Sequence, residues 1–459
     1  MEEVNAFVPP AKVPGSDKPG VFGFLSAMIS DPLRVIPQSA YCEPVGAMTV
    51  LGETVGIVSD PGLVEEILVR RPQDFPKTHI DELVFRPVLG DGLLTAHGDT
   101  WKWKRRLLAP YFSPATLGSR VPDMVVPFEK LAQDWHEARN SKDVDITSAM
   151  TAATFDVISR TLFTNQDEID FQTLSRAIDD YLRPISWVVG LSTLRLPSWI
   201  PHPGMFQLRK ARIAMRQAVA DLVAARRRSK TIRDDICGDL MRAQDADTGR
   251  ILSDEDLVDM LLTLIAAGHE TTANAMTWTL FCLANQPQLQ ERLAREVHEV
   301  CGGRLPVAED VARLNWTEAF IKESMRLFPP APLMARQTLK DEVFGAYHFK
   351  AGTVLFIPVY AIHRHESSWE APGEFRIERF LNVKNGAAGK AGSRTVYMPF
   401  GAGPRICVGW AFAMMEMTAA IAVLLQKVRF SMSTATECDP IHRVTLRPRN
   451  GMRLNVSAT

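Results

Sequence analysis

One cysteine near the C-terminus, Cys407, lies in a glycine-rich loop that could hold its sulfur as a metal ligand. The loop reads FGAGPRICVG over residues 400–409, and an apolar stretch that predicts a helix follows it over 410–425. The thiolate, rather than the thiol, is the form that binds a metal. Loop N–H groups and the positive end of the following helix would stabilise that charge. The alternative is a buried structural thiol, the commoner role of a lone cysteine, which the surrounding Phe, Gly and Arg spacing disfavours.

A second group of chemically capable residues lies in the segment WKWKRR over 101–106. Trp101 and Arg105 are separated by one helical turn and therefore share a helix face. An indole N–H and a guanidinium on that face could bind a carboxylate. Lys102, Lys104 and Arg106 point elsewhere, and two readings stay equally open for them: a basic patch for an acidic electron donor, or a solvated helix face.

A third group is the segment AGHETT over 267–272. Ala267 and Gly268 are small enough to leave space beside a bound group. Thr271 could donate a hydrogen bond to the carbonyl of Ala267, which loosens a helix locally. Glu270 and Thr271 could then relay protons as general acids. The alternative is a helix in which Gly268 only permits close packing and the threonines are incidental.

Three further patterns predict structure rather than chemistry. Glu323 and Arg326 lie on one helix face and predict a buried ion pair. His363 and His365 are predicted to be surface or structural residues, not metal ligands. The segment GAAGK over 386–390 lacks the Ser or Thr that a phosphate-binding loop needs after its Lys, and we expect a flexible surface loop there.

The pattern along the chain predicts a mainly α protein with a smaller β-rich part. A strand is expected over 50–58, followed by a short helix with Asp60 as N-cap and Pro61 in its first turn. Helical periodicity dominates 114–327, and Ser253 is expected to cap a long helix there. Strands are expected over 354–359 and 443–446.

The composition excludes several classes of protein. The chain has 459 residues, 46% of them hydrophobic, and a formal net charge of -1 with a pI of about 6.8, so no basic excess predicts nucleic-acid binding. Its six cysteines form no C-x-x-C pair and fit a reducing, cytoplasmic location. The apolar stretch over 21–29 is too short to cross a bilayer, and no signal peptide is evident, so we expect no transmembrane anchor.

Taken together, these motifs resemble the cytochrome P-450 family of haem-thiolate monooxygenases, and its soluble bacterial members in particular. The cysteine loop matches F-x-x-G-x-R-x-C-x-G at every fixed position, and W-x-x-x-R, A-G-x-[DE]-T-T and E-x-x-R precede it in the family's order. The resemblance adds Arg379, in an I-E-R-F segment where the family has P-E-R-F, as third member of the buried ion network. It implies the cytochrome P-450 fold, a triangular helical domain enclosing haem, over 1–459 as one catalytic domain.

Within that domain we expect an N-terminal extension over 1–45, β-rich parts near 46–60 and 335–400, and a helical core over 100–330 and 407–426. The resemblance implies haem b, with Cys407 as the iron ligand and Glu270 and Thr271 as catalytic residues. It implies the following further cofactor contacts: Trp101, Arg105, Arg336 and Arg405 at the propionates, Phe400, Gly401 and Gly409 around the cysteine, and Ala267 and Gly268 above the haem. Gly403 belongs to the same loop and would permit unusual backbone geometry.

The implied reaction inserts one atom of O2 into an apolar small molecule, by hydroxylation or epoxidation. Electrons would come from a separate ferredoxin and an NAD(P)H-dependent ferredoxin reductase, and a monomer is the default. Residues 84–94 and 185–199, with Leu333 and Met334, are expected to line the substrate pocket, although each could equally be ordinary core. Two rivals stay open: a haem enzyme that uses peroxide or inserts no oxygen, and a haem-binding sensor or electron carrier.

Overall fold

We describe a computed structural model of the chain over residues 7–16, 20–50, 52–164, 170–193, 199–229, 233–381 and 394–459. Its main helices are α1 Val21–Ser30, α2 Pro61–Glu65, α3 His79–Leu89, α4 Gly98–Leu108, α5 Pro114–Gly118, α6 Val121–Glu137, α7 Ile146–Leu162, α8 Phe171–Leu182, α9 Ile185–Thr193, α10 Met205–Ser229, α11 Ile236–Arg242, α12 Asp254–Asn285, α13 Pro287–Cys301, α14 Ala308–Val311, α15 Asn315–Leu327, α16 Val359–Ile362 and α17 Trp410–Leu425. The segment 386–390, for which we expect a surface loop, lies outside the described residues.

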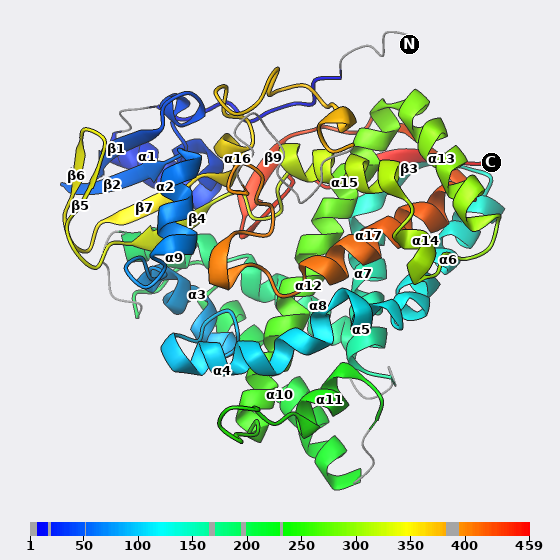
Figure 1. The fold of residues 1–459 in the computed structure, drawn as a ribbon, viewed down its shortest axis with the longest axis horizontal. Coiled ribbons are helices and arrows are strands. Elements are labelled where there is room, and N and C mark those ends of the chain that lie inside the picture. Colours follow the sequence, from blue (N-terminus) through cyan, green and yellow to red (C-terminus); the bar gives the residue numbers. More distant parts are fainter. Residues whose placement is uncertain are drawn as a thin grey trace.

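The strands are β1 Val45–Val50, β2 Glu53–Val58, β3 Asn140–Asp145, β4 Met334–Gln337, β5 Glu342–Phe344, β6 Tyr347–Phe349, β7 Val354–Ile357, β8 Val428–Met432, β9 Pro440–Arg443, β10 Thr445–Pro448 and β11 Arg453–Ala458. They form a four-stranded sheet in the order β1-β2-β7-β4 and three smaller sheets, β3-β11-β8, β10-β9 and β5-β6. Helices α12 and α17 cross the middle of the molecule, and the four-stranded sheet lies to one side (Figure 1). The predicted mainly α fold with a smaller β part is confirmed.

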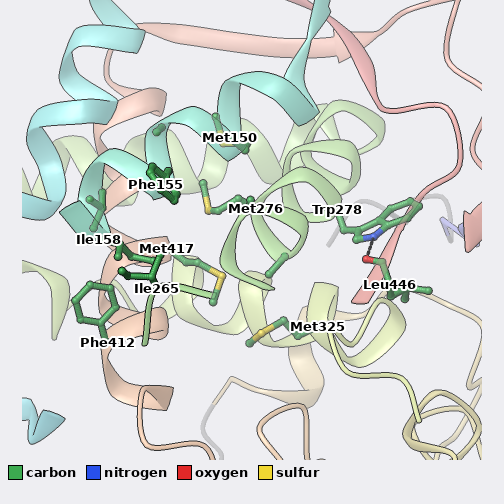
Figure 2. Packing of buried hydrophobic residues seen from close by; sticks show 14 of the residues in the cluster. Met150, Phe155, Ile158, Ile265, Met276, Trp278, Met325, Phe412, Met417 and Leu446 are labelled. Atoms are coloured by element: carbon green, nitrogen blue, oxygen red, sulfur yellow. Dashed lines mark hydrogen bonds between the residues drawn. The ribbon is translucent and has the colours of Figure 1, made fainter. Parts of the chain in front are cut away.

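The core is built where α7, α12, α15 and α17 meet. Figure 2 shows apolar side chains from these helices facing one another, and the indole N–H of Trp278 donating to the carbonyl of Leu446 on β10 at 3.1 Å. That hydrogen bond satisfies the polar atom of a fully buried indole. It also fixes the β9–β10 hairpin against α12, the helix that carries the AGHETT segment.

Helix ends follow their local sequence closely. The carboxylate of Asp60 accepts from the N–H of Leu63 at 2.8 Å, with Pro61 as the first residue of α2. The hydroxyl of Ser253 accepts from the N–H of Asp256 at 3.1 Å and begins α12. Both predicted caps are therefore confirmed, as is the helix predicted over 410–425. Among the described residues, none of the helices combines the length and the apolar character needed to cross a bilayer.

Three predicted strands differ from those observed. The strand expected over 50–58 is a hairpin, β1–β2, because the chain turns at Gly52, whose φ is +80°. The segment 443–446 likewise spans a hairpin, β9–β10, since Val444 has a positive φ of 69°. The third, expected over 354–359, ends at Ile357, and α16 starts two residues later.

The predicted ion network is buried beside α15. Glu323 and Arg326 have fully buried side chains, and the guanidinium of Arg326 donates to both carboxylate oxygens of Glu323 at 2.8 Å. Arg379 Nε lies 3.4 Å from Glu323, as the third member. His363 is also buried here, and the N–H of Met398 donates to its Nε2 at 2.9 Å, so its structural role is confirmed.

Candidate active site

The cysteine loop is held in shape by its own backbone and by a neighbouring turn. The N–H of Cys407 donates to the carbonyl of Phe400 at 2.9 Å. Gly401 and Gly403 have φ values of +76° and +73°, which side chains rarely allow. Gly403 also meets a π-helical turn over Glu66–Arg70, where a Cβ on it would lie 1.9 Å from the carbonyl oxygen of Leu68. The loop therefore requires glycine most strictly at Gly403.

The thiol of Cys407 opens into an internal cavity. Burial raises its pKa, and this effect is opposed by a hydrogen bond from the backbone N–H of Gly409 and by the charge of Arg105. Both opposing groups favour a negative sulfur, so the loop supplies the N–H donor and α4 supplies the cation that stabilise a thiolate ligand.

The cavity has a volume of about 1580 Å³. It connects the cysteine loop with the two segments expected to line the pocket, 84–94 and 185–199, which we call the lids. Its wall includes Phe85, Leu89 and Leu94 from the segment 84–94, Ile185 and Val189 from α9, and also Leu333 and Met334. Each segment expected to line a pocket therefore does so. Positions 194–198 of the second segment lie outside the described residues. The wall is mostly apolar, which suits an apolar ligand.

Three arginines predicted to contact the cofactor line this cavity: Arg105, Arg336 and Arg405. Burial lowers the pKa of all three guanidinium groups, that of Arg405 to about 10, where the positive charge of Arg336 also contributes. Arg405 donates to the carbonyl of Ala96 at 2.9 Å and lies over the ring of Trp101, 4.5 Å from its centroid.

These three arginines have no carboxylate within ion-pair distance among the described residues, although burying cations costs free energy unless anions accompany them. Two propionates of a haem would provide those anions beside the open thiol. The residues present therefore fit a haem whose iron is bound by Cys407 and whose propionates are held by Arg105, Arg336, Arg405 and Trp101.

The segment AGHETT lies on α12 across the cavity. Ala267, Gly268, Glu270 and Thr271 all line it. The hydroxyl of Thr271 donates to the carbonyl of Ala267 at 2.7 Å, as predicted, but the expected loosening is absent, since α12 stays α-helical throughout its length. Gly268 also has the packing role considered for it, because a Cβ there would lie 2.8 Å from Ile158.

The carboxylate of Glu270 contacts the β9–β10 hairpin. It accepts a hydrogen bond from the hydroxyl of Thr445 at 2.7 Å, and Arg447 lies 3.7 Å away. Burial raises the pKa of Glu270, while Arg447 and Thr445 oppose that rise. Burial therefore favours the protonated carboxyl group of Glu270, and a protonated carboxyl group is the form that can act as a general acid.

The basic residues between Trp101 and Arg106 do not form a patch. Lys104 is fully buried, and its ammonium donates to the carbonyl of Asp91 at 2.8 Å and pairs with Asp256 at 2.6 Å. Lys102 pairs with Asp99 at 3.1 Å. Arg106 pairs with Asp245 at 3.0 Å. The reading of these three residues as a basic docking patch is therefore wrong, because each charge is neutralised locally.

Hydrogen bonds join α3 to the helices on the other side of the cavity. The hydroxyl of Tyr181 on α8 donates to the carbonyl of Val84 at 2.6 Å. The Nε2 atom of His79 lies 3.2 Å from the hydroxyl of Ser192 on α9. Helix α3 is thus fastened to both α8 and α9.

Sequence reasoning did not find every residue of the site. Lys77 lines the cavity, donates to the carbonyl of Leu94 at 2.6 Å, and has its pKa lowered to about 8, chiefly by burial. Arg183 and Arg443 also line the cavity. No motif marks these three positions, and only the fold brings them to one space. The unusual backbone geometry predicted for Gly403 is confirmed by its φ of +73°, whereas the π-helical turn that it contacts was not predicted.

Comparisons with known proteins agree with this geometry. A family model described as cytochrome P450 matches residues 38–455. The chain is 30% identical over 414 residues to a cytokinin hydroxylase of Arabidopsis thaliana, with 86% of this chain and 78% of that protein covered. It is 29% identical over 372 residues to cyclooctat-9-en-7-ol 5-monooxygenase of Streptomyces melanosporofaciens, with 80% and 78% covered.

Solved structures lead to the same family. The crystal structure of the haem domain of cytochrome P450DA superposes with a TM-score of 0.83 at 25% identity, and 98% of both chains is covered. The family match spans most of the chain, and the cavity beside Cys407 has the cations and the open thiol that a haem requires. The chain therefore belongs to the cytochrome P450 family and is a haem-dependent monooxygenase.

Proposed function

We propose that this chain binds haem b through Cys407 and inserts one atom of O2 into an apolar small organic substrate, by hydroxylation or epoxidation. A ferredoxin and a ferredoxin reductase that uses NAD(P)H would supply the electrons. The observation that carries the proposal is the single apolar cavity shared by Cys407, by the AGHETT turn of α12 and by both lids. A substrate in that cavity would lie between the lids and the cysteine loop.

The bound haem would supply the activation of O2, and the protein would direct it. Arg105, Arg336, Arg405 and Trp101 would hold the propionates, while Phe400, Gly401 and Gly409 would shape the surroundings of the sulfur. Ala267 and Gly268 on α12 have almost no side chain, so this part of the cavity wall would leave space for small ligands. The apolar wall excludes water from this space.

Glu270 and Thr271 would hold and move the protons that oxygen activation consumes. Thr271 donates to the carbonyl of Ala267 in this structure, so its oxygen keeps acceptor capacity facing the cavity. On the hairpin side, Glu270 accepts a hydrogen bond from Thr445 and lies 3.7 Å from Arg447, and we propose that it would be protonated by solvent there. A turn of its side chain about χ1 and χ2 would carry a proton from the hairpin side to the cavity side, which is general acid work.

We further propose that the chain acts as one catalytic domain over 1–459, as a monomer in the cytoplasm. The six cysteines support a reducing compartment, since all are free thiols in the structure. A haem sensor or electron carrier is the rival from another class. The large apolar cavity next to the thiol favours an enzyme, because a carrier needs no space for a substrate.

Two variants test the proposal. Cys407→Ser should abolish the thiolate signature of the carbon monoxide difference spectrum, whereas an unchanged spectrum would place the ligand elsewhere. Turnover under isotopically labelled O2, with ferredoxin, reductase and NADH, should add one labelled oxygen atom to the product. A carrier would give no product, and a peroxide-using enzyme would give product without the redox proteins.

Thr271→Ala should lower the fraction of electrons recovered in product by about tenfold or more, with peroxide released instead, while substrate affinity stays the same. Thr277→Ala is the matched control. It removes a similar hydrogen bond, from the Thr277 hydroxyl to the carbonyl of Ala273 at 2.8 Å, on the same helix but outside the cavity wall. Equal coupling in both variants would refute the proton-relay role.

A further inference from the structure

Two arginines line the cavity away from the cysteine loop, and the haem does not account for them. Arg183 directly follows α8, and Arg443 is the last residue of β9. Both side chains form part of the cavity wall on the side of Glu270 and the β9–β10 hairpin. They come from distant parts of the sequence, so the fold, rather than a local charge run, places them at one space.

Among the described residues, these two arginines have no carboxylate partner, unlike the other arginines near the hairpin. Arg447 on the same hairpin and Arg449 directly after it each have a carboxylate partner, at 3.7 and 2.6 Å respectively. Among the residues that the structure describes, neither Arg183 nor Arg443 makes a side-chain hydrogen bond or an ion pair. Both residues are exposed, so two guanidinium groups with all their donors available border a cavity whose other walls are largely apolar.

The two side chains also lie close enough to repel each other. Burial lowers the pKa of Arg443, and the positive charges of Arg447, Arg449 and Arg183 lower it further. Asp179 interacts with Arg183 and Asp31 with Arg443 through their charges, but neither carboxylate forms an ion pair with these two arginines, and burial raises the pKa of Asp179. An anion between Arg183 and Arg443 would replace this repulsion by attraction.

The remaining wall shows what such an anion would be attached to. Apolar side chains line much of the cavity that the arginines share with the cysteine loop: Phe85, Leu89, Ile178, Leu182, Val189 and Leu264. A ligand that fills this space needs an extended apolar body. A carboxylate at one end matches the planar, forked donors of a guanidinium, which bind it with two parallel hydrogen bonds.

We propose that the substrate is an apolar organic acid whose carboxylate binds Arg183 and Arg443 while its hydrocarbon body extends towards Cys407. This inference rests on the monooxygenase function proposed above and narrows its substrate class. It also predicts where oxidation occurs. The carboxylate would be anchored at the far side, so the oxygen atom would be added to a carbon remote from it.

The test uses the ferric holoenzyme and three acids of different shape, dodecanoic, abietic and lithocholic acid, each paired with its own methyl ester. The spectral shift of the haem on binding gives a dissociation constant for each. The ester keeps the apolar body and removes only the charge. Because hydrogen bonds to charged groups contribute about 1.5–3 kcal/mol, at least one acid should bind about tenfold or more tightly than its ester.

Variants then assign that preference to the two residues. Arg183→Gln and Arg443→Gln should each reduce the preference for acid over ester, and the double variant should abolish it without weakening ester binding. Arg443→Lys should keep part of it, since the charge remains and the forked geometry is lost. Arg449→Gln is the matched control, because Arg449 lies next to the same hairpin but outside the cavity wall.

Two results would overturn the inference. One is that no acid of the three binds more tightly than its ester, including the case in which none produces a shift. The other is a preference that the double variant leaves unchanged or that Arg449→Gln removes equally. A holoenzyme without the thiolate signature would instead contradict the proposed function, so the two failures are distinguishable.

Discussion

Gly403 offers the sharpest test of how the cysteine loop is positioned. We consider Gly403→Ala. The residue has a φ of +73°, and the added Cβ would lie 1.9 Å from the carbonyl oxygen of Leu68 and 3.2 Å from the Cα of Val69. The obstacle is backbone of a π-helical turn, which cannot rotate away as a side chain could.

The expected cost has two parts. A left-handed backbone costs about 1–2 kcal/mol for a residue with a Cβ. Forcing an extra carbon into a filled space costs about 1–3 kcal/mol more. Gly403→Ala should therefore lower the free energy of unfolding by about 2–5 kcal/mol. Since the oxygen must move by more than 1 Å to reach a normal contact, the loop and its sulfur should shift as well.

Gly302→Ala separates the two parts. Gly302 also has a positive φ, +60°, but nothing lies within 4 Å of its added Cβ. The control variant should lose about 1–2 kcal/mol and keep the wild-type haem spectrum. Both variants would be measured by urea unfolding of the holoenzyme and by the carbon monoxide difference spectrum, and Gly403→Ala should show the larger loss together with a reduced thiolate band.

The reasoning would be refuted if the two variants lost the same stability and kept the same spectrum. Contact with Leu68 would then be relieved at no cost, and the π-helical turn would have no part in placing Cys407. A loss of stability in Gly403→Ala with a normal thiolate band would refute only the second half, namely that the strain reaches the sulfur.

Two further predictions concern buried charges. Arg326→Leu should lower the free energy of unfolding by about 3–5 kcal/mol, because Glu323 is left charged and buried. In urea unfolding, the double variant with Glu323→Leu should recover part of that loss. If the double variant recovers nothing, the buried charge is not the cause. Glu416 is fully buried, both its oxygens lack a hydrogen-bond partner among the described residues, and burial raises its pKa. The unfolded chain therefore loses this proton first as the pH rises above 4.5, so wild-type stability should fall by about 1.4 kcal/mol per pH unit relative to Glu416→Gln. Melting curves from pH 5 to 8 check this, with the exposed Glu299→Gln as control, and parallel curves for wild type and Glu416→Gln would contradict it.

Local chemistry made much of this fold predictable. Asp60, with Pro61 after it, and Ser253 are recognisable as capping residues from the sequence, and the structure has both helices beginning there. Hydrophobic periodicity likewise predicts α17. The hairpins at Gly52 and Val444 were merged into single strands, because one residue of positive φ reverses the chain without any polar stretch to mark it.

The candidate site likewise contains some residues that local sequence identifies and others that only the fold brings together. Residues in the family's motifs, such as Cys407 and Thr271, are found from spacing alone. Lys104 was placed on the surface because a lysine usually is, but Asp256 and a backbone carbonyl satisfy it inside the protein. The convergence of Arg183 and Arg443 depends on how α8 packs near the β9–β10 hairpin, and no local pattern encodes that packing.

The hydrogen bonds that fasten the lids determine how the cavity exchanges its contents. Both bonds end on α3, one from Tyr181 and one from Ser192. Displacement of α3 breaks both at once, whereas displacement of α9 alone leaves the Tyr181 bond intact. Opening of the cavity wall at α3 would therefore require both hydrogen bonds to break together. The residence time of a bound molecule would follow the opening rate of α3, on the microsecond-to-millisecond scale of lid motions.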